Sequence, residues 1–272
     1  MAIIPPFFKS AVVPIGVRQP DSSVTWIGTG FFVTRLINEK DVKPFLITNK
    51  HVFEGRQSIT IRMKENGSDN LKLADASLLN RGRPSYVLHP NPSIDVAVLP
   101  LNGKFIIDNN LEFPSFNIDE HAMTSSELRA NGVDEGSLAY MLGFTLGLVN
   151  EKSKLPVCRL GCIARMSEAQ LQEQHNILID IQNFPGNSGS PVILRPEFIS
   201  ITGTKALDKS VLVGIIHSYI PYEDRLVSSQ TNRVVEVRSE NSGIANAHPV
   251  EFIREIIDGI VPKYIPTAKQ TQ

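Results

Sequence analysis

The chain has 272 residues, of which 42% are hydrophobic, and 27 Lys and Arg residues against 28 Asp and Glu residues give a formal net charge of −1. This length and apolar content suffice for a large buried core, either in one large domain or in two lobes. The sequence has no block of Lys and Arg residues, so we expect neither a nucleic acid nor a membrane as partner.

The N-terminal nine residues lack the basic n-region and the uninterrupted apolar h-region of a signal peptide. The longest nearly apolar run covers residues 138–149, contains two glycines, and is too short to span a bilayer. From these features we predict no signal peptide, no transmembrane segment and a cytoplasmic location.

Short β-rich runs separated by Gly, Asn, Asp and Pro predict two sets of strands along the chain. The first set covers residues 24–33, 45–51, 58–63, 71–78 and 95–101, and the second covers 138–144, 157–166, 176–181, 190–194, 211–217 and 233–237. The polar segment 102–134 lies between the two sets and is predicted to connect them. The pattern predicts an all-β protein with two small barrels, one lobe over residues 10–110 and the other over 130–260.

The last third of the chain contains three further predicted features. A long charged stretch between Tyr219 and Ser242 predicts a hairpin. Pro249 stands at a plausible first helical position, and apolar residues at 253, 256 and 257 have helical spacing, which predicts a C-terminal helix. Residues 261–272 are predicted to be a disordered tail.

The most informative motif is Phe-Pro-Gly-Asn-Ser-Gly-Ser-Pro at residues 184–191. It places Ser188 between Gly186 and Gly189, in a predicted tight turn where successive N–H groups can converge on one point. A serine hydroxyl beside such a point is the arrangement that acyl transfer requires.

A base and a group to orient it precede this serine. His51 follows the apolar run 45–47 in a polar turn, and Asp95 opens the strongly β-forming run 96–101. The order His51, Asp95, Ser188 is the order of the chymotrypsin-type catalytic triad.

On these motifs the chain resembles trypsin-like serine proteases of the chymotrypsin fold, and most closely the bacterial high-temperature-requirement (Deg-type) protease domains, without a PDZ domain. The similar blocks are residues 28–32, 46–52, 95–99, 139–144, 186–191, 213–215 and 242–244. The resemblance covers roughly residues 10 to 258. It implies two six-stranded antiparallel β-barrels with a C-terminal helix.

The resemblance also implies a mechanism and a substrate pocket. His51 would act as general base and acid, Asp95 would fix its tautomer, and Ser188 would attack the peptide carbonyl. The N–H groups of Gly186 and Ser188, assisted by Asn187, would bind the oxyanion. By family position the substrate-pocket candidates are Gln182, Asn183, His217, Ser218, Tyr219 and Gly243. The predicted hairpin would rim the substrate cleft and select an extended protein or peptide substrate.

Several alternatives follow from the same residues. His89 competes as a base, but its loop position indicates a surface histidine. An α/β-hydrolase would need a Gly-x-Ser-x-Gly elbow between a strand and a helix, and a base after the serine, as His217 or His248 are; it is disfavoured because position 190 is serine and Pro191 opens a predicted strand. Cys158 and Cys162 lie roughly 13 Å apart in a strand and are interpreted as buried free thiols. No His or Cys spacing indicates a metal, and no cofactor is expected. The main competing function is a latent or inactive protease-fold scaffold that binds a partner protein.

Overall fold

The computed structural model describes residues 4–150, 152, 155–197 and 205–265. The N-terminal half forms an eight-stranded sheet in the order β5-β4-β1-β2-β3-β9-β8, with β10 pairing with β2. Its strands are β1 (Val12–Arg18), β2 (Val24–Leu36), β3 (Val42–Thr48), β4 (Ser58–Lys64), β5 (Leu71–Ser77), β8 (Val87–Leu88), β9 (Ala97–Pro100) and β10 (Phe116–Asn117). A short separate pair consists of β6 (Leu79–Asn80) and β7 (Arg83–Pro84).

The C-terminal half forms a closed six-stranded barrel in the order β11-β12-β13-β16-β15-β14. Its strands are β11 (Leu138–Gly143), β12 (Val157–Arg165), β13 (Ile177–Asp180), β14 (Pro191–Leu194), β15 (Val211–Val227) and β16 (Val234–Pro249). With the C-terminal helix that follows, this arrangement confirms the predicted all-β, chymotrypsin-like fold class.

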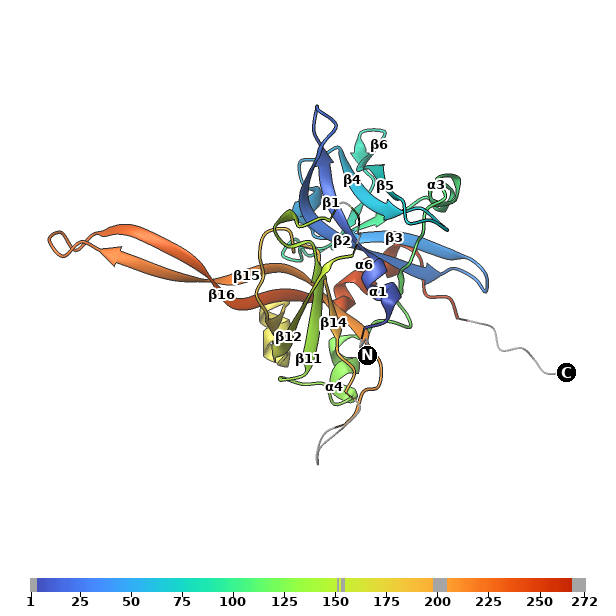
Figure 1. The fold of residues 1–272 in the computed structure, drawn as a ribbon. Coiled ribbons are helices and arrows are strands. Elements are labelled where there is room, and N and C mark those ends of the chain that lie inside the picture. Colours follow the sequence, from blue (N-terminus) through green and yellow to red (C-terminus); the bar gives the residue numbers. More distant parts are fainter. Residues whose placement is uncertain (1–3, 151, 153–154, 198–204, 266–272) are drawn as a thin grey trace.

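Short helices connect and flank the strands, as Figure 1 shows. They are α1 (Pro6–Ser10), α2 (Lys50–Phe53), α3 (Gly103–Asp108), α4 (Ser125–Ala130), the 3-10 turn η1 (Thr145–Gly147), α5 (Glu168–Gln174) and α6 (Val250–Ile260). The predicted connection 102–134 therefore contains helices α3 and α4, which its polar composition did not indicate. The prediction for the C-terminal helix was one residue off, since Pro249 is the N-cap residue of α6.

Alternation along the central strands sends side chains into two different cores. Phe31 and Ile47, which are paired between β2 and β3, join a cluster that also includes Leu142 of the barrel and Ile253 of α6. Their neighbours Phe32 and Leu46 face the other way, into the core of the N-terminal sheet. A third cluster fills the barrel. The shared cluster fixes the two halves and α6 against one another, and the site described below lies where the halves meet.

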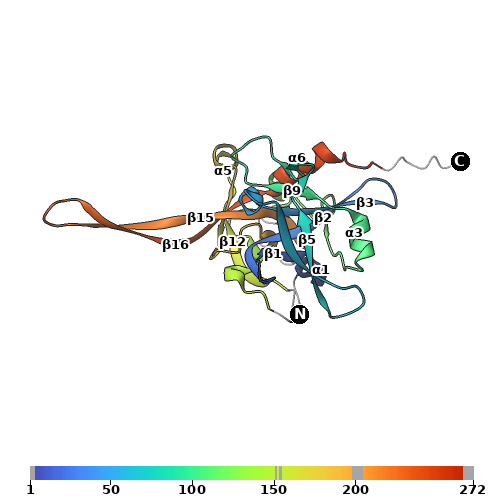
Figure 2. The same cartoon turned by 90° about the horizontal axis from the view of Figure 1, so that it is seen from above.

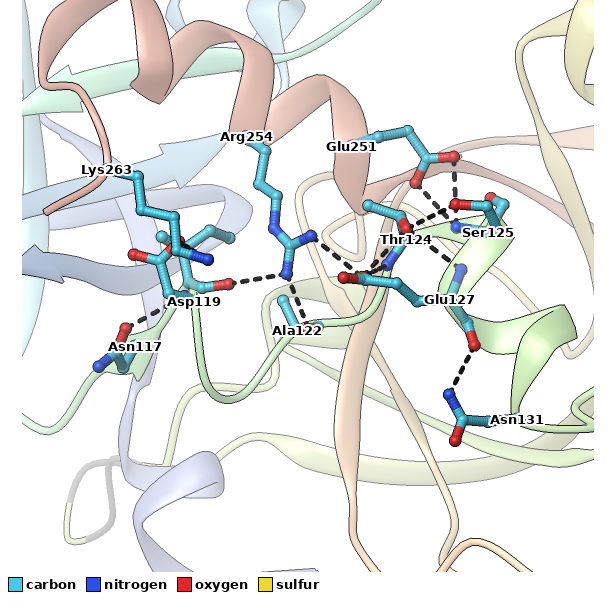
Figure 3. Close-up of polar contacts among 12 residues, drawn as sticks. Asn117, Asp119, Ala122, Thr124, Ser125, Glu127, Asn131, Glu251, Arg254 and Lys263 are labelled. Atoms are coloured by element: carbon cyan, nitrogen blue, oxygen red, sulfur yellow. Dashed lines mark hydrogen bonds and ion pairs between the residues drawn. The ribbon is translucent and has the colours of Figure 1, made fainter. Parts of the chain in front are cut away.

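Helix α6 is also attached by polar contacts to the segment that connects the two halves (Figure 3). Arg254 donates to Glu127 Oε2 at 3.0 Å and to the carbonyl oxygen of Ala122 at 2.9 Å. Thr124 and Glu127 form a capping box at the start of α4. Glu251 accepts from the N–H of Ser125, and burial raises the pKa of its carboxyl group. These contacts hold α4 beside α6.

Strands β15 and β16 continue together beyond the barrel as a two-stranded hairpin, which extends away from the rest of the molecule in both views (Figures 1 and 2). Pairing is recorded from Pro221 and Asn241 out to Val227 and Val234. This confirms the hairpin predicted between Tyr219 and Ser242. Of the tail predicted over residues 261–272, residues 266–272 lie outside the described part of the chain.

Candidate active site

His51 is positioned by the transition from β3 to α2. The strand ends at Thr48, Asn49 caps the following helix with an extended backbone, and His51 lies in that helix. Asn49 is fully buried, and its side-chain Nδ2 donates to the carbonyl oxygen of Asp95 at 2.7 Å. The residue that starts the helix of His51 therefore also fixes the main chain of Asp95.

Two hydrogen bonds join His51 to the carboxylate of Asp95. The ring Nδ1 lies 2.5 Å from Oδ2, and the main-chain N–H of His51 donates to Oδ1 at 3.1 Å. Burial is the largest influence on Asp95 and opposes its ionisation, but the hydrogen bonds and charge of His51 outweigh it and hold the pKa of Asp95 below its usual range. Because an ionised carboxylate only accepts, it places the proton of His51 on Nδ1 and leaves a lone pair on Nε2.

Ser188 lies in a turn in which two positions, 186 and 189, require glycine. Gly186 has φ +94°, and a Cβ there would lie 2.4 Å from the carbonyl oxygen of Phe144. Gly189 has φ +87°, and a Cβ there would lie 2.0 Å from the carbonyl oxygen of Thr29. Both residues are in the left-handed region and in close backbone contact, so neither position accommodates a side chain.

The two peptide groups that precede Gly186 and Ser188 have fixed orientations. The carbonyl oxygen of Pro185 accepts from the N–H of Leu146 at 2.6 Å, and the carbonyl oxygen of Asn187 accepts from the N–H of Ser190 at 2.9 Å. Among the described residues no peptide bond is cis, so the N–H of each group points opposite to its carbonyl. Within that part of the chain, neither the Gly186 N–H nor the Ser188 N–H has a hydrogen-bond partner. Two main-chain donors are thus free beside Ser188.

The outcome for Asn187 differs from the expectation. Its N–H donates to the carbonyl oxygen of Phe184 at 3.1 Å, so it is not available to assist the two free donors. Its side chain is fully buried, and its Oδ1 accepts from the hydroxyl of Thr145 at 2.8 Å. Asn187 therefore stabilises the turn through its contacts with Phe184 and Thr145.

Thr29 connects the serine turn to the N-terminal half. Its N–H donates to the carbonyl oxygen of Ser188 at 2.8 Å, and its hydroxyl donates to the carbonyl oxygen of Gly186 at 2.7 Å. The hydroxyl of Thr48 in turn donates to the carbonyl oxygen of Thr29 at 2.7 Å. Next to Thr29, a Cβ on Gly28 would touch both Val52 and the carbonyl oxygen of Ser188. The serine turn thus lies against the strand and helix that carry His51.

Sequence reasoning quoted Thr29 and Thr48 only as members of similar blocks and assigned them no role. Both are fully buried hydroxyl residues inside apolar strands. A buried hydroxyl requires a partner, and that requirement is the sequence signal that could have found these two residues.

The pocket candidates occupy neighbouring positions at the start of the β15–β16 extension. Asn183 is buried and donates from Nδ2 to the carbonyl oxygen of Ser218 at 3.0 Å, and Gly243 has φ +86° and faces the side chain of Gln182. Tyr219 is exposed.

His217 lies among other groups. Its ring stacks on that of His248, with centroids 4.0 Å apart, and its Nε2 lies 2.8 Å from Asn176 Oδ1. Burial, and then the neighbouring His248, lower the pKa of His217 to about 3. The charge of Asp95 acts on His217 in the opposite direction, so His217 lies near Asp95, and its role in the substrate pocket stays a prediction.

Two expectations outside the site were wrong. His89 is not a surface residue: its side chain is only 8% exposed, and it pairs with Glu255 at 2.8 Å because α6 packs over its loop. Cys158 and Cys162 are free, as predicted, but neither is buried, since Cys158 is exposed and Cys162 is half-buried on β12.

Within the described residues, no cluster of His, Cys, Asp and Glu has the geometry of a metal site. None of the helices in the described part of the chain is long and apolar enough to cross a membrane.

The family described as trypsin-like peptidase domain matches residues 28–197, which include His51, Asp95 and Ser188. This match covers more than half of the chain. A search of curated proteins finds no similar sequence.

Proposed function

We propose that this chain, which belongs to the family of trypsin-like peptidase domains, is a serine endopeptidase that cleaves peptide bonds through an acyl-enzyme. The family membership supports a peptidase of the serine type. The assignment of the individual steps to residues rests on the site geometry.

Ser188 is the proposed nucleophile and His51 the general base. With its proton held on Nδ1 by Asp95, His51 has a lone pair on Nε2 that accepts the hydroxyl proton as Ser188 Oγ attacks the carbonyl carbon. The same nitrogen then donates the proton to the leaving amine. A water deprotonated by His51 cleaves the resulting ester and returns Ser188 to its free form.

The free N–H groups of Gly186 and Ser188 are the proposed oxyanion hole. The charge on the carbonyl oxygen of the substrate grows during attack, and fixed donors aimed at it stabilise the transition state more than the ground state. Losing one such donor costs roughly 3 kcal/mol of transition-state stabilisation. The hydrogen bonds that hold the Pro185 and Asn187 carbonyls support a hole that exists before substrate binds.

One observation carries this proposal: the His51–Asp95 pair and the two free donors beside Ser188 occur together where the two halves meet. Within the described residues, no hydrogen bond joins Ser188 Oγ to His51 Nε2. That is compatible with a free protease, because catalytic hydrogen bonds are often long until substrate is bound.

The proposed substrate is an extended segment of a protein. Ser218 lies in β15 and Gly243 lies in β16, and both strands continue into the hairpin. A polypeptide bound at these two residues would therefore contact the part of the hairpin nearest the barrel. Exposed apolar side chains on the hairpin include Tyr222, Leu226 and Val235, which offer contact area to an unfolded or extended chain.

The test is hydrolysis of a peptide library, with new N-termini identified by mass spectrometry. We expect cleavage by the natural protein and a loss of at least roughly a thousandfold for Ser188→Ala and for His51→Ala. Cleavage that persists in Ser188→Ala would overturn the assignment of the nucleophile. A folded natural protein that cleaves nothing and accepts no acylating reagent would favour the scaffold alternative.

A further inference from the structure

His248 is a buried histidine that contacts the main chain of Asp95. Its side chain projects from β16, and the residue is only 2% exposed. Nε2 of its ring accepts from the N–H of Asp95 at 3.0 Å, and Nδ1 donates to the carbonyl oxygen of His175 at 2.8 Å. The ring therefore joins the end of α5 to the residue that orients His51.

These two contacts fix the protonation state of His248. A carbonyl oxygen only accepts, so Nδ1 must carry a proton, and a main-chain N–H only donates, so Nε2 must carry a lone pair. A second proton on Nε2 would face the N–H of Asp95 and break that hydrogen bond. The position of Asp95 therefore requires the neutral ring with its proton on Nδ1.

The surroundings of His248 oppose a positive charge. The ring of His217 stacks on it at an interplanar angle of 10°, and Phe252 of α6 packs edge-on. The hydrogen bond to the His175 carbonyl and the charge of Asp95 favour protonation, whereas the charges of His175 and His89 act against it, and His89 is itself paired with Glu255. Burial is the largest influence, and it holds the pKa of His248 below its usual range.

Asp95 is thus held at two main-chain atoms by side chains from two other elements, α2 with its cap and β16. Asn49 binds its carbonyl oxygen from the side of His51, and His248 binds its N–H from the barrel of the other half. Losing either contact frees the peptide on one side of the carboxylate.

We propose that His248, in its neutral form with the proton on Nδ1, is a positioning residue that fixes Asp95 and through it the tautomer and orientation of His51. This inference rests on the proposed function. His248 touches neither the substrate nor the reacting atoms. Through its hydrogen bond to the N–H of Asp95, it fixes the position of the His51–Asp95 pair relative to the C-terminal barrel.

The test compares two amide substitutions at one position. In His248→Gln the side-chain oxygen reaches the place of Nε2 and accepts from the N–H of Asp95, whereas in His248→Asn the shorter amide reaches only the place of Nδ1. We expect kcat/KM to fall at least tenfold in His248→Asn, mainly through kcat, and to be largely restored in His248→Gln. The matched control is His121→Gln, at a histidine away from the site. It removes the ring nitrogen Nδ1, which accepts a hydrogen bond from the main-chain N–H of Asn117 at 2.9 Å. Equal losses in the Gln and Asn variants would overturn the proposal.

The pH dependence of kcat is a second test, because a residue that only supports the fold would not change the shape of the pH profile. In the natural protein, acidification should protonate His248 on Nε2, break its hydrogen bond to the N–H of Asp95 and so add to the acid loss of kcat. In His248→Gln this contribution should be absent and the acid limb less steep, because the amide does not titrate. An unchanged steepness would contradict the inference.

A spectroscopic measurement separates this inference from the proposed function. In Ser188→Ala protein, nitrogen-15 NMR of the histidine rings should show His248 neutral with its proton on Nδ1, and the Nδ1 signal of His51 should shift in His248→Asn but not in His248→Gln. This outcome would support the positioning role even if the natural protein proved inactive. A proton on Nε2 of His248, or an unshifted His51 in both variants, would overturn it.

Discussion

Lowering the pH from 7 to 5 is expected to destabilise the folded protein through His217. The pKa of this histidine is about 3 in the folded protein against an ordinary value of 6.5. Below pH 6.5 the unfolded chain therefore binds a proton that the folded protein does not, and the stability conferred by His217 is lost as the pH falls toward 3.

The size of the effect follows from these two pKa values. At about pH 7 both states are mostly deprotonated, whereas at about pH 5 only the unfolded state is protonated, so the free energy of unfolding should fall by about 2 kcal/mol from this residue alone. His248 acts in the same direction, because burial also lowers its pKa.

The assay is urea unfolding at pH 7 and pH 5, followed by the fluorescence of Trp26, the only tryptophan. His217→Gln is the matched variant, since its amide can still donate to Asn176 but does not titrate. Using Ser188→Ala protein throughout prevents self-cleavage. On acidification, the protein that retains His217 should lose about 2 kcal/mol more than the His217→Gln variant. Equal losses would refute the reasoning.

Three further predictions concern the site and the hairpin. Asp95→Asn should lower kcat by about 10⁴ with the fold retained, because an amide can donate to Nδ1 and so favour the wrong tautomer of His51; a loss below roughly tenfold in peptide assays would contradict this role. Gly186→Ala should lower kcat at least roughly a hundredfold, because a Cβ would collide with the Phe144 carbonyl and displace a free N–H donor; normal turnover would show that the turn adapts. Replacing residues 223–239 with Asn-Gly joins the paired residues Tyr222 and Glu240 by a two-residue turn; it should leave hydrolysis of short peptides intact but slow cleavage of an unfolded protein substrate, and equal slowing of both would show that the hairpin supports the fold instead.

The sequence allowed the fold class and many of the strand positions to be predicted, because the signals for strands are local. Continuous apolar runs such as 45–47 and 192–194, bounded by turn residues, are enough to indicate short strands. Strand β1 was missed, and the helices of the connection were missed as well. The capping box at Thr124 and Glu127 was a readable sign of α4, but the polar character of the segment concealed it.

The proposed triad was predicted from motif order, whereas its supporting residues were not. His51, Asp95 and Ser188 each lie in a recognisable block, but contacts of Thr29 and His248 join segments separated by more than 150 residues. Such contacts depend on how the two halves pack together, which local patterns do not specify. The same limit applies to His217: family position made it a pocket candidate, but the stacking of its ring on His248 could not be predicted from the sequence.

The orientation of the oxyanion turn also depends on tertiary structure. The glycines predicted a tight turn, but only the partner of the Pro185 carbonyl, the N–H of Leu146 in η1, determines which way the Gly186 N–H points. The hydrogen bond from the Asn187 N–H to the carbonyl oxygen of Phe184 could not be predicted from the sequence either.

The most direct test of the central claim is reaction of the purified protein with a fluorophosphonate probe, with the adduct located by peptide mass spectrometry. A serine reacts with such a probe when an adjacent base and an oxyanion hole activate it. We predict one adduct on Ser188 that is absent from Ser188→Ala and strongly reduced in His51→Ala. A folded protein that remains unlabelled, or one labelled at a different serine, would contradict the claim that His51, Asp95 and the Ser188 turn form a competent active site.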